Sequence, residues 1–207
     1  MNRRIAVLIS GRGSNLQALI DAVSQRRLDA EIAIVISNRA DAPGLERARA
    51  ARIETLTLPH RDFATRDAFE AALVRELRAR DVTLVCLAGF MRLLGATFLD
   101  AFANRILNIH PSLLPAFPGV DAQRQALEHG AKVAGATVHF VTGELDGGPI
   151  VTQRAIPVRD DDTVDTLAAH ILDVEHAIYP EAVGLVLDGG WAIDGRRFRR
   201  TEGPVTG

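Results

Sequence analysis

Short apolar runs alternate with amphipathic helical stretches along most of this chain, and this alternation limits the folds that it can adopt. Runs of strand length, rich in Val, Ile and Leu, cover residues 5–9, 31–37, 82–87 and 105–109. Three of them are almost uninterrupted by polar residues, as expected for strands covered by helices on both faces. The helical stretches between them cover residues 14–26, 44–52 and 64–80. Repeated strand–helix–strand units predict an α/β fold, Rossmann-like and doubly wound, with a mostly parallel sheet.

The second half of the chain has a less regular pattern. Three prolines within residues 110–119 exclude regular helix and central strand there. Residues 132–141 alternate well enough to form a strand, and Thr163 is predicted to cap a long final helix. An Asp-Gly pair within residues 191–198 predicts a hairpin. Because no repeat or linker divides the sequence, we expect a single domain over residues 1–207.

The charge balance and the apolar segments exclude several classes of protein. The formal net charge is -2, and a general nucleic-acid binder would need a basic face instead. Aromatic residues make up 5% of the chain, too few to indicate a stacking platform for single strands. Cys86 is the single cysteine, so no disulfide can form within the chain. The first apolar run is too short for a membrane span or a signal-peptide core, which predicts a cytoplasmic protein.

A glycine-rich loop, Ser-Gly-Arg-Gly-Ser-Asn-Leu at residues 10–16, follows the first strand and leads into a helix. Such a loop presents free backbone N–H groups and the positive end of the helix dipole to an anion. Ser14 and Gln17 have the spacing of a capping box. Leu16 replaces the third glycine of the dinucleotide fingerprint, and the Walker lysine is absent. The loop therefore predicts a site for one phosphate monoester, with a tight turn that binds no ligand as the alternative.

Asn108 and His110 form the most informative pair in the sequence. Side chains two residues apart on a strand share a face, so the two point the same way while Leu107 and Ile109 point oppositely. Carboxyl ends of strands line the ligand crevice in open α/β sheets. A carboxamide N–H and a protonatable imidazole suit a reaction in which a carbonyl oxygen becomes an oxyanion. A structural Asn and a hydrogen-bonded His at a strand end are the alternative.

Asp146 lies in a turn-rich loop and could stabilise the charged form of a nearby imidazole, although the sequence cannot place it beside His110. Its alternative role is that of an Asx-turn residue. His139 shares a strand face with Thr137 and is expected to border the site. Cys86 is interpreted as a buried small hydrophobe, and no spacing typical of metal ligands occurs.

Five segments together resemble the folate-dependent formyltransferase family, and in particular its phosphoribosylglycinamide formyltransferases. The likeness runs from about Ile5 to Pro180, and the string Asn-x-His-Pro-Ser-Leu-Leu-Pro with a later Leu-Asp-x-Gly-Pro carries the reaction class. Ala116 replaces a residue that is usually basic in the family, and Gly143 one that is commonly acidic. The segments that carry the resemblance are residues 11–16, 87–94, 108–115, 138–141 with 144–149, and 175–180.

The resemblance implies a role for each matching residue. Asn108, His110 and Asp146 match the catalytic residues. The acceptor substrate is implied to contact Gly13, Ser14, Asn15, Leu172, Asp173, Val174 and Glu175. The formyl donor is implied to contact Arg66, Met91, Arg92, Leu93, Leu94, Asn108, Thr142, Gly143, Glu144, Leu145 and Asp146. Residues 1–105 would then form a phosphate-binding half, and residues 106–207 a catalytic and folate-loop half.

The implied reaction moves the formyl group of 10-formyltetrahydrofolate to the amine of 5-phosphoribosylglycinamide, a step of de novo purine biosynthesis. The resemblance implies that the protein binds these two small molecules and no metal, nucleic acid or membrane. It also implies a monomer or weak homodimer. The alternatives are a 10-formyltetrahydrofolate hydrolase, which would normally carry an N-terminal regulatory domain, and a non-catalytic phosphoribosyl-ligand binder. A formyltransferase for aminoacyl-tRNA would normally carry a nucleic-acid-binding domain.

Overall fold

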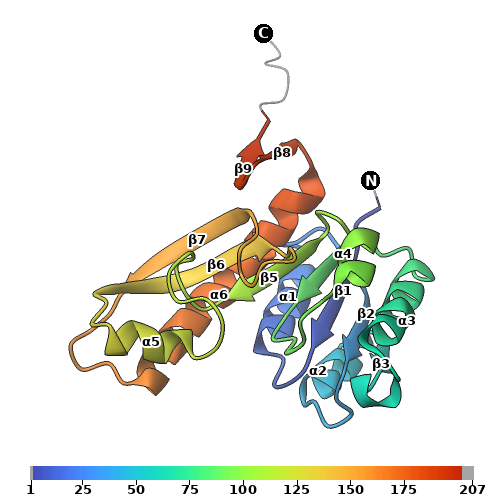
Figure 1. Cartoon of the computed structure of the whole chain (residues 1–207), viewed down its shortest axis with the longest axis horizontal. Helices are drawn as coiled ribbons and strands as arrows, with labels where there is room; N and C mark the ends of the chain where they lie inside the picture. The colour runs from blue at the N-terminus through green and yellow to red at the C-terminus, as the bar shows by residue number, and fades with distance from the viewer. Residues whose placement is uncertain (1, 202–207) are drawn as a thin grey trace.

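In the computed structural model, which describes residues 2–201, nine strands form one sheet in the order β3-β2-β1-β4-β5-β6-β7-β9-β8 (Figure 1). The strands are β1 Arg4–Ile9, β2 Glu31–Ser37, β3 Thr55–Thr57, β4 Leu84–Leu87, β5 Ile106–His110, β6 Val133–Phe140, β7 Ile150–Pro157, β8 Trp191–Asp194 and β9 Arg197–Arg200. The α-helices are α1 Ser14–Ser24, α2 Gly44–Ala50, α3 Arg66–Arg78, α4 Ala96–Ala101, α5 Ala122–Glu128 and α6 Val164–Asp188, and a 3₁₀ turn spans His60–Asp62. No helix within residues 2–201 is both long and apolar enough to cross a membrane.

The first five strands form a parallel, doubly wound unit, as predicted. β1 lies between β2 and β4, and all the pairings from β3 through β5 are parallel. Side chains of β1 alternate between the two faces: Ile5 packs with α1 and α6, whereas Leu8 packs with α3 and α4. The continuous apolar runs therefore arise because both faces of these strands are buried.

The long helix α6 packs along β5, β6 and β7 on one face of the sheet (Figure 1). Its start is confirmed, because the Thr163 side chain accepts a hydrogen bond from the Thr166 backbone N–H. Tyr179 is fully buried, and its hydroxyl donates to the carbonyls of Leu87 and Leu107 at 2.9 and 3.2 Å. α6 is thus attached directly to the two central strands, at the end of β4 and within β5.

The sequence located most long elements correctly but missed several short ones. The predicted strand at residues 82–87 begins only at Leu84, because the backbone N–H of Val82 closes the preceding helix onto the Leu77 carbonyl. The predicted hairpin is confirmed as β8 and β9. The strands β3 and β7 and the short helices α4 and α5 were not predicted. β7 carries partly exposed residues along its length, so it lacks the apolar run that marks the central strands.

Candidate active site

The carboxyl ends of β4 and β5 border a cavity of about 650 Å³, in the position expected for a ligand site in an open α/β sheet. Leu87, at the end of β4, lies beside Asn108 in the parallel register and lines the cavity with it. Residues from both sides of position 105 line this space, so the predicted halves meet there. The lining is Arg66, Leu87, Phe90, Arg92, Leu93, Leu94, Gly95, Ala96, Leu99, Asp100, Asn108, His139, Val141, Thr142, Gly143, Glu144, Leu145 and Asp146.

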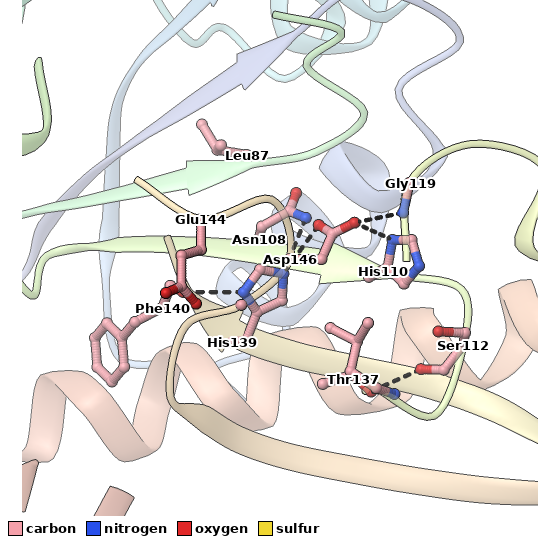
Figure 2. A network of polar contacts seen from close by, with 12 residues as sticks. Leu87, Asn108, His110, Ser112, Gly119, Thr137, His139, Phe140, Glu144 and Asp146 are labelled. Carbon is pink, nitrogen blue, oxygen red and sulfur yellow. Dashed lines mark hydrogen bonds and ion pairs between the residues drawn. The ribbon is translucent and has the colours of Figure 1, made fainter. Parts of the chain in front are cut away.

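Asn108 is held by His139 across the β5–β6 pair. The two residues are direct partners in the antiparallel register, and Asn108 Nδ2 lies 3.2 Å from His139 Nε2 (Figure 2). His139 Nδ1 lies 2.9 Å from the Phe140 carbonyl, which can only accept. Nδ1 therefore donates to that carbonyl, and Nε2 faces both the Asn108 carboxamide and the Asp146 carboxylate. The Asn108 side chain is therefore held against His139 at the wall of the cavity.

His110 lies at the end of β5, on the same sheet face as Asn108, as predicted. Its flanking neighbour Ile109 and the preceding Leu107 pack into the opposite core with α6. The ring is 4% exposed, and two acceptors face its two nitrogens. Nδ1 lies 3.5 Å from the Asp146 carboxylate, and Nε2 lies 2.9 Å from the Phe117 carbonyl. The ring is thus held between a carboxylate and a carbonyl, both of which are hydrogen-bond acceptors.

Asp146 faces both histidines, a placement that the sequence could not predict (Figure 2). Its Oδ1 lies 3.6 Å from His139 Nε2, and its Oδ2 accepts a 2.8 Å hydrogen bond from the Gly119 backbone N–H. Burial opposes its ionisation, but the contacts with His139, Gly119 and His110 outweigh burial and hold the pKa of Asp146 below its ordinary value. The carboxylate is therefore ionised at neutral pH and able to stabilise an imidazolium.

The glycine-rich loop between β1 and α1 has the geometry of an anion site. Gly13 adopts a φ of 72° and forms the N-cap of α1. A Cβ on Gly13 would lie 2.7 Å from the Cα of Gly44, so the close approach of these two backbones requires glycine there. The predicted capping box is wrong: Ser14 is already helical, no side chain caps α1, and the Gln17 side chain instead donates to Asp21. The helix N-terminus is thus left free of a protein side chain.

Asn15 and Glu175 join this loop to α6. Asn15 Nδ2 donates to Glu175 Oε2 at 2.7 Å, while Asn15 Oδ1 is buried without a hydrogen-bond partner. Burial raises the pKa of Glu175 to about 7, and the hydrogen bond from Asn15 opposes this shift. A buried acid and an amide with an unused acceptor are suited to bind hydroxyl or amine groups of a polar ligand.

Replacement of Glu175 by glutamine is expected to stabilise the protein at alkaline pH. The folded-state pKa of about 7 lies above the ordinary 4.5, so the cost of burying the carboxylate grows between these pH values and then stays constant. Glutamine carries no such cost, and the gain at pH 8 is expected to reach about 3 kcal/mol, with a much smaller gain at pH 5. Urea unfolding at both pH values measures it. Glu181→Gln, on an exposed part of the same helix, is the control, and equal gains at pH 5 and 8 would contradict the assignment.

The predicted contacts of the two ligands fall into separate parts of the structure. Ten of the eleven residues expected to contact the formyl donor line the cavity, and Met91 is the exception, with a side chain 73% exposed. Met91 instead donates its backbone N–H to the Ser10 hydroxyl at 2.9 Å. On α6, Asp173 is exposed, Leu172 is half-buried and Val174 packs in the core.

Sequence reasoning missed several residues of the cavity wall. Leu87 and Val141 directly end or follow strands, so the rule that ligands lie at the carboxyl ends of strands could have identified them. Leu99 lies on α4, whose existence the sequence did not reveal. Cys86 is buried, as predicted, and burial raises the pKa of its thiol to about 12. Residues 2–201 contain no cluster of His, Cys, Asp and Glu suited to hold a metal ion.

Comparison with known proteins assigns the chain to a family. Residues 3–183 match the family described as formyl transferase. The chain is 49% identical to phosphoribosylglycinamide formyltransferase of Escherichia coli (strain K12), over 94% of this chain and 95% of that protein. It is also 49% identical to the trifunctional purine biosynthetic protein adenosine-3 of Drosophila melanogaster, over 90% of this chain but only 14% of that much longer protein. The crystal structure of glycinamide ribonucleotide transformylase 1 from Symbiobacterium toebii superposes with a TM-score of 0.95 at 57% identity, covering 97% of this chain and 95% of that one. The chain therefore belongs to the formyl transferase family.

Proposed function

We propose that this chain transfers the formyl group of 10-formyltetrahydrofolate to the amine of 5-phosphoribosylglycinamide. The observation that carries the proposal is that Asn108 and Asp146 line a cavity of about 650 Å³ and that His110 lies 3.5 Å from Asp146. The names of the relatives from E. coli and S. toebii support the choice of reaction and acceptor. A cytoplasmic location and a monomeric or weakly dimeric state remain predictions.

The cavity suits the formyl donor. Leu87, Phe90 and Val141 give it an apolar wall for a planar ring, and backbone groups of the segments at residues 92–96 and 141–146 are available to bind the ring edge. The guanidinium groups of Arg66 and Arg92 belong to the same lining and suit a carboxylate at the other end of the donor. This volume lies within the range of pockets that enclose a molecule of this size.

The acceptor site is proposed at the loop between β1 and α1. The free N-terminus of α1, with Gly13, Ser14 and Asn15, would hold the phosphate. Glu175, which Asn15 contacts directly, would bind the ribose or the glycinamide end. Tyr179, one helical turn after Glu175, donates to the carbonyls that end β4 and precede Asn108. These contacts support an acceptor site that lies close to the strands carrying the proposed catalytic residues.

The proposed reaction is a direct transfer. The neutral amine of the acceptor attacks the formyl carbon, a C–N bond forms, and the formyl oxygen becomes an oxyanion. Asn108 Nδ2–H and the His110 imidazolium stabilise that oxyanion, which requires His110 Nε2 to exchange the Phe117 carbonyl for the substrate. The bond from the formyl carbon to N10 of the folate then breaks. N10 gains a proton while the new amide nitrogen loses one, and tetrahydrofolate leaves.

A spectroscopic assay tests this function. The absorbance of 10-formyl folate is followed with the wild-type protein, in the presence and absence of 5-phosphoribosylglycinamide. Deformylation that depends on the acceptor is the expected result. Deformylation without acceptor would identify a hydrolase instead, and no turnover in either condition, together with binding of the phosphoribosyl compound alone, would identify a non-catalytic binder.

The double substitution Ser14→Ala with Asn15→Ala is expected to weaken acceptor binding selectively. Each side chain lost removes about one hydrogen bond to a charged or polar ligand group, so the KM for the acceptor should rise by roughly 10- to 100-fold. The KM for the formyl donor should change little, because neither residue lines the donor cavity. Steady-state kinetics with each substrate varied in turn measure both constants.

Ser24→Ala, at the far end of α1, is the matched control. Equal losses for both ligands would contradict the phosphate-site assignment.

A further inference from the structure

The hairpin of β8 and β9 contacts the turn that carries Asp146, although it lies outside residues 3–183, the part of the chain that matches the family. Figure 1 shows the hairpin beyond the end of α6. Arg196 occupies the connection between the two strands. It is the one residue of this hairpin, within the part that the structure describes, that pairs with a residue of the cavity wall.

Arg196 holds the turn at two points. Its Nη1 lies 3.3 Å from Glu144 Oε2, and its Nη2 donates to the Gly147 carbonyl. These two residues also close the turn on themselves, because the backbone N–H of Gly147 donates to the Glu144 carbonyl at 3.3 Å. One guanidinium therefore spans a turn whose third residue is Asp146. The planar fork of arginine is suited to such a two-point contact.

The hairpin is anchored well enough to act as a fixed support. The Phe198 and Trp191 rings pack on each other with centroids 5.5 Å apart, and both pack on Phe140 at the end of β6. The Trp191 indole N–H donates to the Val186 carbonyl of α6 at 2.9 Å. β9 also pairs with the first residue of β7. Arg196 thus extends from a packed element to the turn that carries Asp146.

The turn needs support because of its backbone conformation. Asp146 adopts a φ of 49°, a left-handed conformation that a residue with a Cβ adopts at a cost. A turn that relaxed from this conformation would move the carboxylate away from His110 and from the Gly119 N–H. Glu144, the other end of the span, belongs to the cavity wall itself.

We propose that Arg196 is a positioning residue, which braces residues 144–147 so that Asp146 faces His110 and the donor cavity keeps its wall. The kinetic part of this proposal rests on the proposed function. Without the Arg196 contacts, kcat should fall because Asp146 is no longer held facing His110. The KM for the formyl donor should rise because the cavity wall at Glu144 is no longer held in place. The KM for the acceptor should stay unchanged.

Comparison of Arg196→Ala with Arg199→Ala tests the brace. Arg199 lies in the same hairpin and is comparably exposed. Among residues 2–201 its ion pair is with Asp194 of that hairpin, so it is a matched control. Hydrogen exchange of the backbone amides at residues 143–148 is measured first, without any ligand. Arg196→Ala is expected to raise this exchange about three- to tenfold, and to lower kcat over donor KM by a similar factor. Arg199→Ala is expected to do neither, and both variants should keep the wild-type Tm.

Two outcomes would overturn the proposal. One is an equal effect of the two substitutions on exchange and on kinetics. The other is raised exchange in Arg196→Ala with unchanged kcat and donor KM, since the brace would then have no part in the reaction. A wild-type protein without formyl transfer would contradict the proposed function instead, and the exchange measurement would still decide whether Arg196 holds the turn.

Discussion

Replacement of His110 by alanine is expected to lower kcat by about 10²- to 10⁴-fold, the usual contribution of a positioned acid or base. The His110 ring lies between the Asp146 carboxylate and the Phe117 carbonyl, and in the proposed reaction it supplies an N–H donor to the developing oxyanion. The KM for each substrate should change far less, because the loss falls on the transition state. Steady-state and single-turnover kinetics at saturating substrate measure the effect.

Folding must be shown to survive this substitution. The Phe117 carbonyl loses its donor, so a stability loss of about 1 kcal/mol is expected, which urea unfolding can detect. His170→Ala provides a control, because His170 lies on α6 outside the cavity lining, is partly exposed and faces the Asp162 carboxylate. A folded His110→Ala variant with a near-normal rate would show that the imidazole has no part in the transfer.

The central sheet could be predicted because its strands are buried on both faces. Such burial produces continuous apolar runs, and β1 and β2 follow these runs closely. The same reasoning fails for β7, which pairs with β6 but leaves Gln153 and Arg154 exposed. It also fails for α4 and α5, which are too short to show a helical period. The capping box failed because the left-handed Gly13 takes the N-cap position that Ser14 was expected to hold.

Strand geometry could predict the part of the candidate site that lies on β5 and β6. The two-residue period of β5 places Asn108 and His110 on one face, and the same period on β6 placed His139 correctly beside them. Asp146 follows no such rule. Its position depends on how the turn between β6 and β7 folds back over the end of β5, and on a backbone N–H from Gly119. No local sequence pattern indicates either the path of this turn or the hydrogen bond from Gly119. The resemblance to a family was therefore needed to identify Asp146.

Replacement of Asp146 by asparagine is expected to lower kcat by about 10²-fold or more while the shape of the side chain is retained. An asparagine can still accept from the Gly119 N–H, but it presents an NH₂ group where the carboxylate faced the histidines. That group would take the place of Oδ1 beside His139, while the oxygen left facing Gly119 and His110 Nδ1 carries no negative charge. His110 would therefore lose its carboxylate partner in the transition state. Kinetics at saturating substrates, read beside those of His110→Ala, measure the loss.

The stability of Asp146→Asn has a pH dependence of its own. The pKa of Asp146 is held below its ordinary value of 3.8, so the carboxylate stabilises the fold above that pH, and this contribution is lost as the pH falls through the folded-state pKa. The wild type should therefore exceed the variant in stability at pH 7, and the difference should shrink in acid.

Asp121→Asn is the matched control, since Asp121 has a similar φ of 55° but is exposed, and its side chain caps no helix. Because asparagine tolerates this backbone conformation as well as aspartate does, a loss of rate in Asp146→Asn alone would be due to the missing charge. Equal rates in the two variants and the wild type would mean that His110 works without a carboxylate partner.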